Sequence, residues 1–186
     1  MSLKRKTISS IEELTQLEAM IAEAAAATAA SLSRELQETR DLSSLARLKF
    51  EQAGCDPLDL NRGLNFVEQL NQSFTYLASL EGAKCLLGRH PEHAPYHLNL
   101  GTSPGPDIVS SDGVVAAETF AATHPDSNDK LKKDLEKIRL TSAKHRYVFY
   151  LSPVETKRTA DDVAIIRLTH ASLGGLTSRG RMSNTR

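Results

Sequence analysis

Apolar positions recur at helical spacing over two long stretches of the chain. From Ser10 to Arg40 an alanine-rich segment carries its larger apolar residues on one side, and Ser10 and Glu13 fit a capping box at its start. A second stretch runs from about Asn61 to Leu87, with a stripe made of Phe66, Leu70, Phe74, Leu77, Leu80 and Leu87. The spacing predicts two long amphipathic helices, with a shorter helical stretch over residues 42–51 between them.

From Tyr96 onward the pattern changes to short runs rich in β-branched and aromatic residues, which are typical of strands. Good helix-start residues then appear at 125–127, before an apolar stripe at helical spacing. The elements expected in this part are strands over 96–100, 106–109 and 114–123, a helix, and strands over 146–151 and 163–168.

This order predicts an α/β protein, in which a mixed sheet is flanked by helices and preceded by an N-terminal helical extension. Residues 1–60 are interpreted as that extension and as a candidate element for self-association. Residues 61–172 are expected to form the α/β core. The basic, serine-containing segment 173–186 is expected to be a flexible tail.

An Asp112-Gly113 dipeptide lies between two of the predicted strands and favours a tight hairpin turn. A two-residue or four-residue loop at this turn pairs Asp107 with Glu118, whereas an odd-numbered loop, or a turn at 110–111, gives another register. In the first case two carboxylates lie about 5 Å apart on one sheet face, where like charges are destabilising. That arrangement predicts a cation between them.

Each carboxylate also has a simpler interpretation when it is taken alone. Asp107 can be a solvated residue after Pro106, and Glu118 can lie on the polar face of a half-exposed strand. However, the residues on both sides of Glu118, 114–117 and 120–122, are mostly apolar, which is typical of a strand covered on both faces. A carboxylate in such a strand needs a partner.

The sequence of a helix, three strands, a helix and a further strand, with Pro106-Asp107 on the second strand and Glu118 on the third, resembles the PD-(D/E)XK, or restriction-endonuclease-like, nuclease superfamily. The resemblance covers roughly residues 61–152. It implies hydrolysis of phosphodiester bonds in DNA with Mg²⁺, or Mn²⁺ in its place, held by acidic residues of the first helix and of the second and third strands. The residues that match are Glu81, which faces inward on a helical wheel, Asp107 and Glu118.

The superfamily pattern places a lysine two residues after the third-strand carboxylate, and this chain has Phe120 there. A replacement has to reach the same sheet face from the helix that follows. Lys130, near the start of that helix, is the first choice, and Lys133 lies one turn on. Lys132 points to the opposite side, and Lys137 continues the row of Lys130 further away. Alternatively, these lysines form a solvated face, and the protein is an inactive binding or interaction module.

Charge is distributed unevenly, although the formal net charge is zero. Residues 1–129 hold 10 basic and 18 acidic residues, whereas 130–186 hold 13 and 5. This asymmetry is expected when one segment meets a polyanion such as DNA, but the halves can also attract each other or pair across a homodimer. The candidate contacts to the DNA backbone are Lys132, Lys137, Arg139, Lys144 and Arg146.

Two further features bear on environment and on metals. Cys55 and Cys85 lack a CxxC spacing, and no signal segment or membrane-length apolar stretch is visible, so we expect a cytoplasmic protein without membrane contact. The loop His90–His97 collects three histidines and Glu92. It either binds a metal or is an ordinary surface loop, since its spacing matches no zinc signature.

Overall fold

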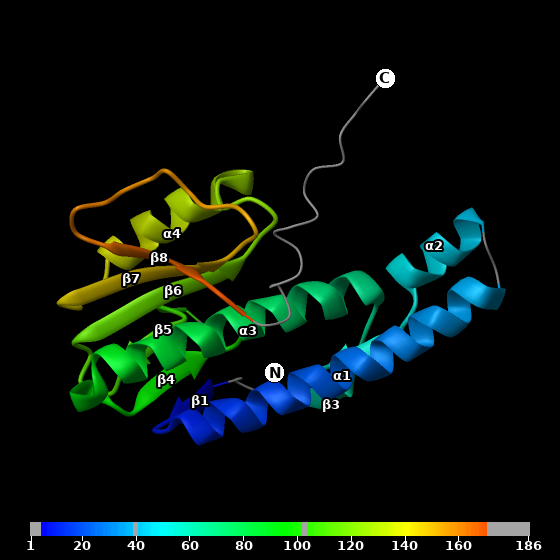
Figure 1. The fold of residues 1–186 in the computed structure, drawn as a ribbon, viewed down its shortest axis with the longest axis horizontal. Coiled ribbons are helices and arrows are strands. Elements are labelled where there is room, and N and C mark those ends of the chain that lie inside the picture. Colours follow the sequence, from blue (N-terminus) through cyan, green and yellow to red (C-terminus); the bar gives the residue numbers. More distant parts are fainter. Residues whose placement is uncertain (1–4, 39–40, 102–103, 171–186) are drawn as a thin grey trace.

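Six strands form one mixed sheet in the order β1-β4-β5-β6-β7-β8 in the computed structural model, which describes residues 5–38, 41–101 and 104–170 (Figure 1). An antiparallel meander is formed by β4 (Tyr96–Asn99), β5 (Ile108–Ser110) and β6 (Val115–Ala121). Two strands continue the sheet parallel to β6, namely β7 (His145–Leu151) and β8 (Ala164–Leu168). At the opposite edge β1 (Arg5–Ile8) pairs with β4.

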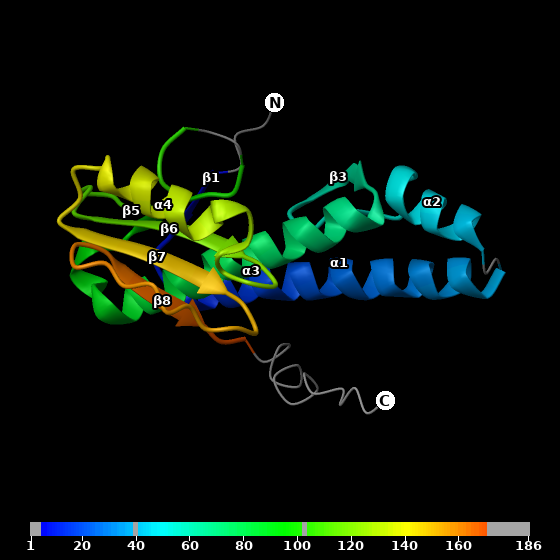
Figure 2. The same cartoon turned by 90° about the horizontal axis from the view of Figure 1, so that it is seen from above.

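Helices cover both faces of this sheet (Figure 2). On one face lies α3 (Phe66–Arg89), with α1 (Ile11–Glu38) packed along it, and a 3-10 turn, η1 (Pro91–His93), follows α3. On the other face lies α4 (Lys130–Arg139), which follows a second 3-10 turn, η2 (Ser127–Asp129). The apolar core is therefore split in two by the sheet, with Leu80, Ile108 and Phe149 on the α3 side and Phe120, Leu131 and Val148 on the α4 side.

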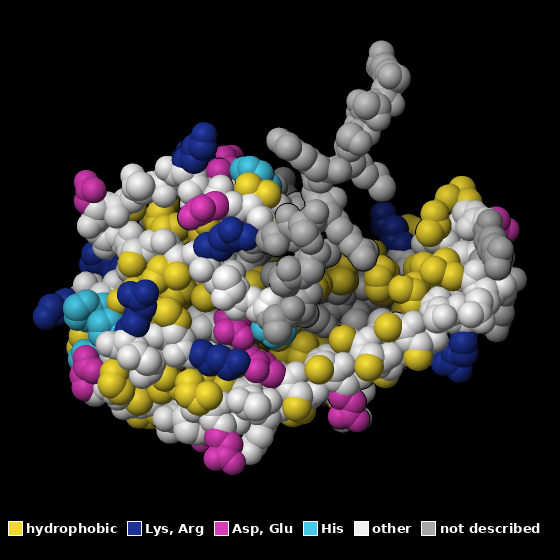
Figure 3. Space-filling model, in the orientation of Figure 1, with side chains coloured by type: hydrophobic (Ala, Val, Ile, Leu, Met, Phe, Trp, Pro, Cys, Tyr) yellow, Lys and Arg dark blue, Asp and Glu magenta, His cyan; other side chains and the backbone are white. Residues whose placement is uncertain are grey.

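An arm extends beyond the sheet, built from the second half of α1, from α2 (Leu42–Phe50) and from a hairpin of β2 (Gly54–Asp56) and β3 (Asp59–Leu64) (Figure 1). The buried carboxylate of Asp56 accepts hydrogen bonds from Arg62 and from the hydroxyl of Tyr76, which fixes the hairpin on α3. Apolar side chains are exposed on the arm (Figure 3), and those on α2 are Leu42, Leu45 and Phe50.

The predicted α/β class and the predicted order of elements from residue 66 to residue 168 are confirmed. Three strands were not predicted, because residues 54–64 form the hairpin of β2 and β3 where a loop and a helix start were expected, and residues 5–8 form the edge strand β1. Within the expected extension, Ile8, Leu14 and Ile21 belong to the same core as the sheet. The expected tail, 173–186, lies outside the described residues.

The expected hairpin register is also confirmed, because Ile108 pairs with Ala117 and Val109 with Ala116. The same register, continued by one residue, places Asp107 opposite Glu118. In the described part of the chain, no helix combines the length and apolar character needed to cross a bilayer.

Helix α3 approaches the sheet closely at Gly82. A Cβ atom at this position would lie 3.1 Å from Phe149 Cδ2 and 3.2 Å from Ile108 Cδ1, whereas at Gly88, on the same helix, it would meet no atom within 4 Å. Larger side chains at Gly82 therefore have to push α3 away from the strands that carry the site described below.

We expect Gly82→Val to lower the free energy of unfolding by about 1–3 kcal/mol, the usual cost of overpacking a core, measured by urea denaturation. Gly88→Val is the matched control and should leave the stability unchanged or raise it slightly, because valine has the better helix propensity. Equal denaturation midpoints for the two variants would contradict the close packing at Gly82.

Candidate active site

Glu118 lies in the middle of β6 and is buried beneath α4, with 1% of its surface exposed. Its neighbours on the same strand face, Ala116 and Phe120, belong to the core on the α4 side. Thr119 points the other way, and its hydroxyl lies 2.7 Å from that of Ser79 on α3. The alternation of a strand thus commits Glu118 to the face covered by α4.

Asp107 lies directly before the first residue of β5 and continues the pairing with β6 there. The ladder between β5 and β6 reaches Ala117, and beyond it the Asp107 carboxylate accepts hydrogen bonds from the backbone N–H of Thr119 at 2.8 Å and from its hydroxyl at 3.3 Å. Gly113, at φ 72°, adopts the left-handed backbone that the preceding turn requires. The turn and these two bonds fix Asp107 next to Glu118.

A lysine side chain supplies the cation that the two carboxylates require. Lys137 Nζ donates a hydrogen bond to Glu118 Oε2 at 2.7 Å and lies 3.9 Å from Asp107 Oδ1. The lysine side chain is 47% exposed, so this ion pair opens to solvent on one side. Asp107, Glu118 and Lys137 therefore meet at one place, although they come from three different elements.

The expected lysines, Lys130 and Lys133, do not reach this pair. Lys130 Nζ donates to Asp134 Oδ1 at 2.6 Å and lies 5.8 Å from the ring centre of Phe120, while Lys133 donates to the carbonyl oxygen of Asn128. The physical reason is the direction of α4. The chain leaves β6 at its carboxyl end, and α4 then runs antiparallel to this strand. The lysine further along the chain, Lys137, is therefore the one that lies over Glu118.

The sequence prediction did not include Asp134, which the structure places beside this group. Its side chain is 4% exposed, it accepts the bond from Lys130, and its charge raises the pKa of Glu118. A signal for it was present in the sequence. On a helical wheel Asp134 falls about 40° from Ile138, at the edge of the apolar stripe of α4, where a carboxylate is unexpected unless it has a partner.

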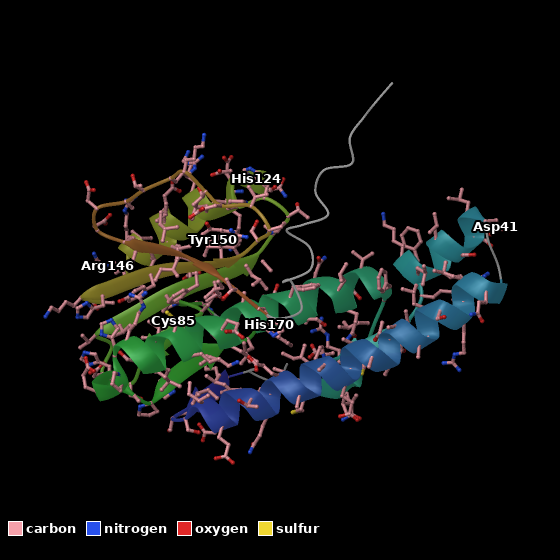
Figure 4. All side chains as sticks on the ribbon, in the orientation of Figure 1. Asp41, Cys85, His124, Arg146, Tyr150 and His170 are labelled. Atoms are coloured by element: carbon pink, nitrogen blue, oxygen red, sulfur yellow. The ribbon has the colours of Figure 1, made fainter. Side chains whose placement is uncertain are left out.

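Glu81 was expected to join Asp107 and Glu118, and the structure does not bring it to them. It lies on α3, on the opposite side of the sheet, where it accepts a hydrogen bond from Lys84 at 3.2 Å. Lys84 also pairs with Glu18 of α1, and His170 lies 4.0 Å from Glu81 beside α3 (Figure 4). The helical wheel correctly placed Glu81 on the buried side of α3, but at this position that side faces α1 and not the sheet.

The five basic residues expected to contact DNA differ in their surroundings. Lys132 and Lys144 are exposed. Arg139 is held by three hydrogen bonds to Asp162, and Arg146, labelled in Figure 4 near the start of β7, donates to the carbonyl oxygen of Thr141. Lys137 belongs to the carboxylate group described above.

Burial and like charge set the proton affinity of this group. Burial, and then the charge of Asp107, raise the pKa of Glu118 to about 7, although the hydrogen bond from Lys137 opposes the change. Burial likewise raises the pKa of Asp134. Burial alone would lower the pKa of Lys137, but its bond to Glu118 and the charge of Asp107 raise it instead. Lys137 is therefore a permanent cation, whereas Glu118 titrates near neutrality.

Two buried carboxylate oxygens, Glu118 Oε1 and Asp134 Oδ2, have no hydrogen-bond partner within the described residues. A buried acceptor without a partner costs about 1–3 kcal/mol, and more when it is charged. Oxygen atoms of this kind are the ligands that Mg²⁺ and Mn²⁺ prefer. The group therefore has the donor set for a hard divalent cation.

The raised pKa of Glu118 predicts a pH-dependent stability. Because its pKa is higher in the folded chain, its contribution is fully present below its ordinary pKa of 4.5 and is lost as the pH rises through about 7. At about 1.4 kcal/mol per pKa unit, wild type should lose up to roughly 3 kcal/mol from this group, and Glu118→Gln should not.

Urea denaturation between pH 4.5 and pH 8 measures this difference, with Glu136→Gln, an exposed position on α4, as the control. The Glu118→Gln curve should rise relative to both wild type and the control as the pH increases. If the stability of all three proteins changes in parallel with pH, the titration assigned to Glu118 is wrong.

Comparison of the chain with protein-family models, with curated proteins and with solved structures gave no match in any of the three cases.

Proposed function

We propose that this chain is a metal-dependent nuclease-fold protein that hydrolyses phosphodiester bonds in DNA, with Asp107, Glu118 and Lys137 in its active site. One observation carries the proposal, namely the meeting of two strand carboxylates and a helix lysine on a single, partly open patch. The patch combines the ligands for a divalent cation with a fixed positive charge, which is the pairing that phosphodiester hydrolysis requires.

The arrangement of elements supports the same proposal. Helix α3, the meander β4-β5-β6, helix α4 and strand β7 follow one another in the order of the PD-(D/E)XK superfamily, and β7 lies parallel to β6. The chain departs from that pattern at Phe120, which stacks on Tyr150 at 5.9 Å between ring centres and fills the core under α4. Lys137 supplies from the helix the charge that Phe120 cannot supply from the strand.

Asp107 and Glu118 would hold the divalent cation, with Asp134 as a further oxygen ligand. Bound there, the cation would lower the pKa of a coordinated water and stabilise the charge that grows on the phosphate. The unpartnered oxygens of Glu118 and Asp134 support this assignment, because coordination would satisfy both. The bonds from Thr119 hold the carboxylate of Asp107 in place for the same purpose.

Lys137 would act as a fixed charge and not as a base. Its raised pKa keeps the ammonium protonated, so it donates hydrogen bonds to a phosphate oxygen or to the attacking water. Its stem is half exposed and can turn from Glu118 toward a substrate without unfolding any element. Lys132 and Lys144, which are exposed, are the proposed contacts to the DNA backbone, and they read no sequence.

A second function, binding of nucleic acid without cleavage, is favoured by one specific observation. Lys137 already lies within ion-pair distance of both Asp107 and Glu118 in the structure, so the pair has a counter-ion without any metal. Assembly of homodimers, expected from the sequence, stays a prediction for either function, and the exposed side chains of α2 are candidates for such a contact.

In the first experiment, plasmid and short duplex DNA are incubated with the wild-type protein and 5–10 mM Mg²⁺ or Mn²⁺, amounts that are about saturating for a millimolar site. We expect cleavage that falls at least about 100-fold in Asp107→Asn, Glu118→Gln and Lys137→Met, since each removes a ligand or the fixed charge. Lys133→Met is the matched control and should retain activity, because Lys133 bonds to the Asn128 carbonyl outside the site.

DNA binding by fluorescence anisotropy separates the two functions. Binding of DNA by the wild-type protein with no cleavage in either metal would establish the second function in place of the first. Cleavage that survives in Glu118→Gln or Lys137→Met would exclude these residues from the reaction.

Metal affinity should depend on pH, because burial raises the pKa of Glu118 to about 7 and the metal requires the ionised form. We expect Mn²⁺ affinity, measured by calorimetry, to rise by up to about tenfold per pH unit below pH 7 and to level off above it. Glu118→Asp, which keeps a carboxylate on a shorter stem, is the control for charge alone. If the Mn²⁺ affinity of the wild-type protein does not change with pH, Glu118 is not a ligand of the metal.

A further inference from the structure

Three histidines meet at the end of the sheet where α3 ends and β7 begins. His90 caps α3, His93 ends η1, and His145 is the first residue of β7. The rings of His90 and His145 are stacked with their centres 4.7 Å apart, and the ring of His93 lies 6.0 Å from the first and 6.3 Å from the second. One nitrogen of each ring lies within 4.8 Å of the other two.

This group differs from the loop cluster expected from the sequence. His97, the third histidine of that loop, lies on β4 and contacts the hydroxyls of Thr7 and Ser111. Its place is taken by His145, which is far away in the sequence. Since β7 starts beside the carboxyl end of α3, the topology of the sheet brings His145 to the loop, and no local spacing could have shown this.

One ring nitrogen of His93 and one of His90 already have polar partners. His93 Nδ1 lies 2.6 Å from Asp112 Oδ2, and His90 Nε2 lies 2.7 Å from the hydroxyl of Tyr147. Histidines that bind metals are oriented in this way, with one nitrogen bonded to a carboxylate or another polar group and the other on the ion. The nitrogens left for an ion are Nε2 of His93 and Nδ1 of His90.

A carboxylate points at those same two nitrogens. Glu92 Oε1 lies 3.6 Å from His90 Nδ1 and 3.5 Å from His93 Nε2. These separations are longer than a good hydrogen bond and leave space for a shared ion. Donor atoms around a tetrahedral zinc ion lie about 3.3 Å apart, so the three ring nitrogens, now within 4.8 Å of one another, would have to draw together, and Glu92 would have to turn toward His145 to complete the coordination.

The Asp112 carboxylate orients the ring of His93. It is itself held in place, since it accepts hydrogen bonds from the Ser110 hydroxyl at 2.6 Å and from the Val114 N–H at 3.0 Å. It therefore favours a proton on Nδ1 of His93 and a free electron pair on Nε2.

We propose that His90, His93, His145 and Glu92 form a binding site for a transition-metal ion of the zinc class. Imidazole nitrogen with a single carboxylate suits Zn²⁺, Co²⁺, Ni²⁺ and Cu²⁺, whereas Mg²⁺ prefers oxygen alone. Four protein ligands close the coordination sphere, so the ion is structural and ties the end of α3 to the start of β7. The proposal is independent of the nuclease function, because the site shares no residue with Asp107, Glu118 and Lys137.

The test uses the full chain without a histidine tag, freed of metal by a chelator and titrated with ZnCl₂ in the calorimeter and with CoCl₂ in the spectrophotometer. We expect one Zn²⁺ per chain in the micromolar range or tighter, the visible absorption of tetrahedral Co²⁺, a higher melting temperature, and no displacement by 10 mM Mg²⁺, an about physiological excess.

His145→Gln and His93→Gln should each weaken zinc binding at least about 100-fold, and Asp112→Asn, which removes the partner of a ligand, by about 10–100-fold. His97→Gln and His124→Gln are the controls, since His97 contacts hydroxyls and His124 lies at the other end of the sheet (Figure 4). Glu118→Gln should bind zinc like wild type, which separates this site from the proposed nuclease site.

Either of two results would overturn the proposal. One is the absence of zinc binding by wild type at 100 µM metal, about a hundred times the expected dissociation constant. The other is zinc binding that persists in His93→Gln or that is lost in the His97→Gln and His124→Gln controls. His93 lies in the short turn η1, outside the sheet, so this variant keeps the test valid even if a substitution of His145 in β7 prevents folding.

Discussion

The burial of the Glu118 carboxylate inside a strand that is covered on both faces is the constraint on which the rest of this structure depends. A charge in such a place is expensive unless a partner reaches it, and the partner here is Lys137, at 2.7 Å. The helix that carries Lys137 has to cross β6 in one direction and at one position. Asp107 must also approach, since the shorter β5 leaves the Thr119 N–H to its carboxylate. The burial of Glu118 in β6 thus constrains where β5 and α4 lie.

The two faces of the sheet divide the polar chemistry of the molecule. Side chains that alternate along β6 go to α4 or to α3, so the acidic residue of α3, Glu81, cannot share a site with Glu118 and pairs with Lys84 instead. The turn at Asp112 belongs to both proposed sites, because it sets the register that aligns Asp107 and also supplies the carboxylate that orients His93. Each face, and each end of the sheet, therefore presents a different set of donor atoms.

Much of the fold could be predicted from the sequence, because period and turn chemistry are local. The Asp112-Gly113 turn gave the register of β5 and β6, and the apolar run around Glu118 gave its burial. The predictions that failed concerned contacts between residues that lie far apart in the sequence. The choice of Lys130 over Lys137 followed distance along the chain, whereas α4 runs antiparallel to β6, and the union of His90 with His145 depends on which strands are neighbours. The edge strand at residues 5–8 carries no hydrophobic alternation, and only its pairing with β4 defines it.

That edge strand has a consequence for how the molecule is made. Ile8 pairs with Tyr96, and Arg5 with Asn99, so β1 cannot pair until β4 has been synthesised, after α1, α2 and α3. Contacts between such distant segments slow folding, because the entropy of closing a long loop is lost before these contacts can stabilise the chain. As long as β1 has not paired, the edge of β4 is exposed and can pair with strands of other nascent chains. The pairing of β1 with β4 thus also protects this edge of the sheet from aggregation.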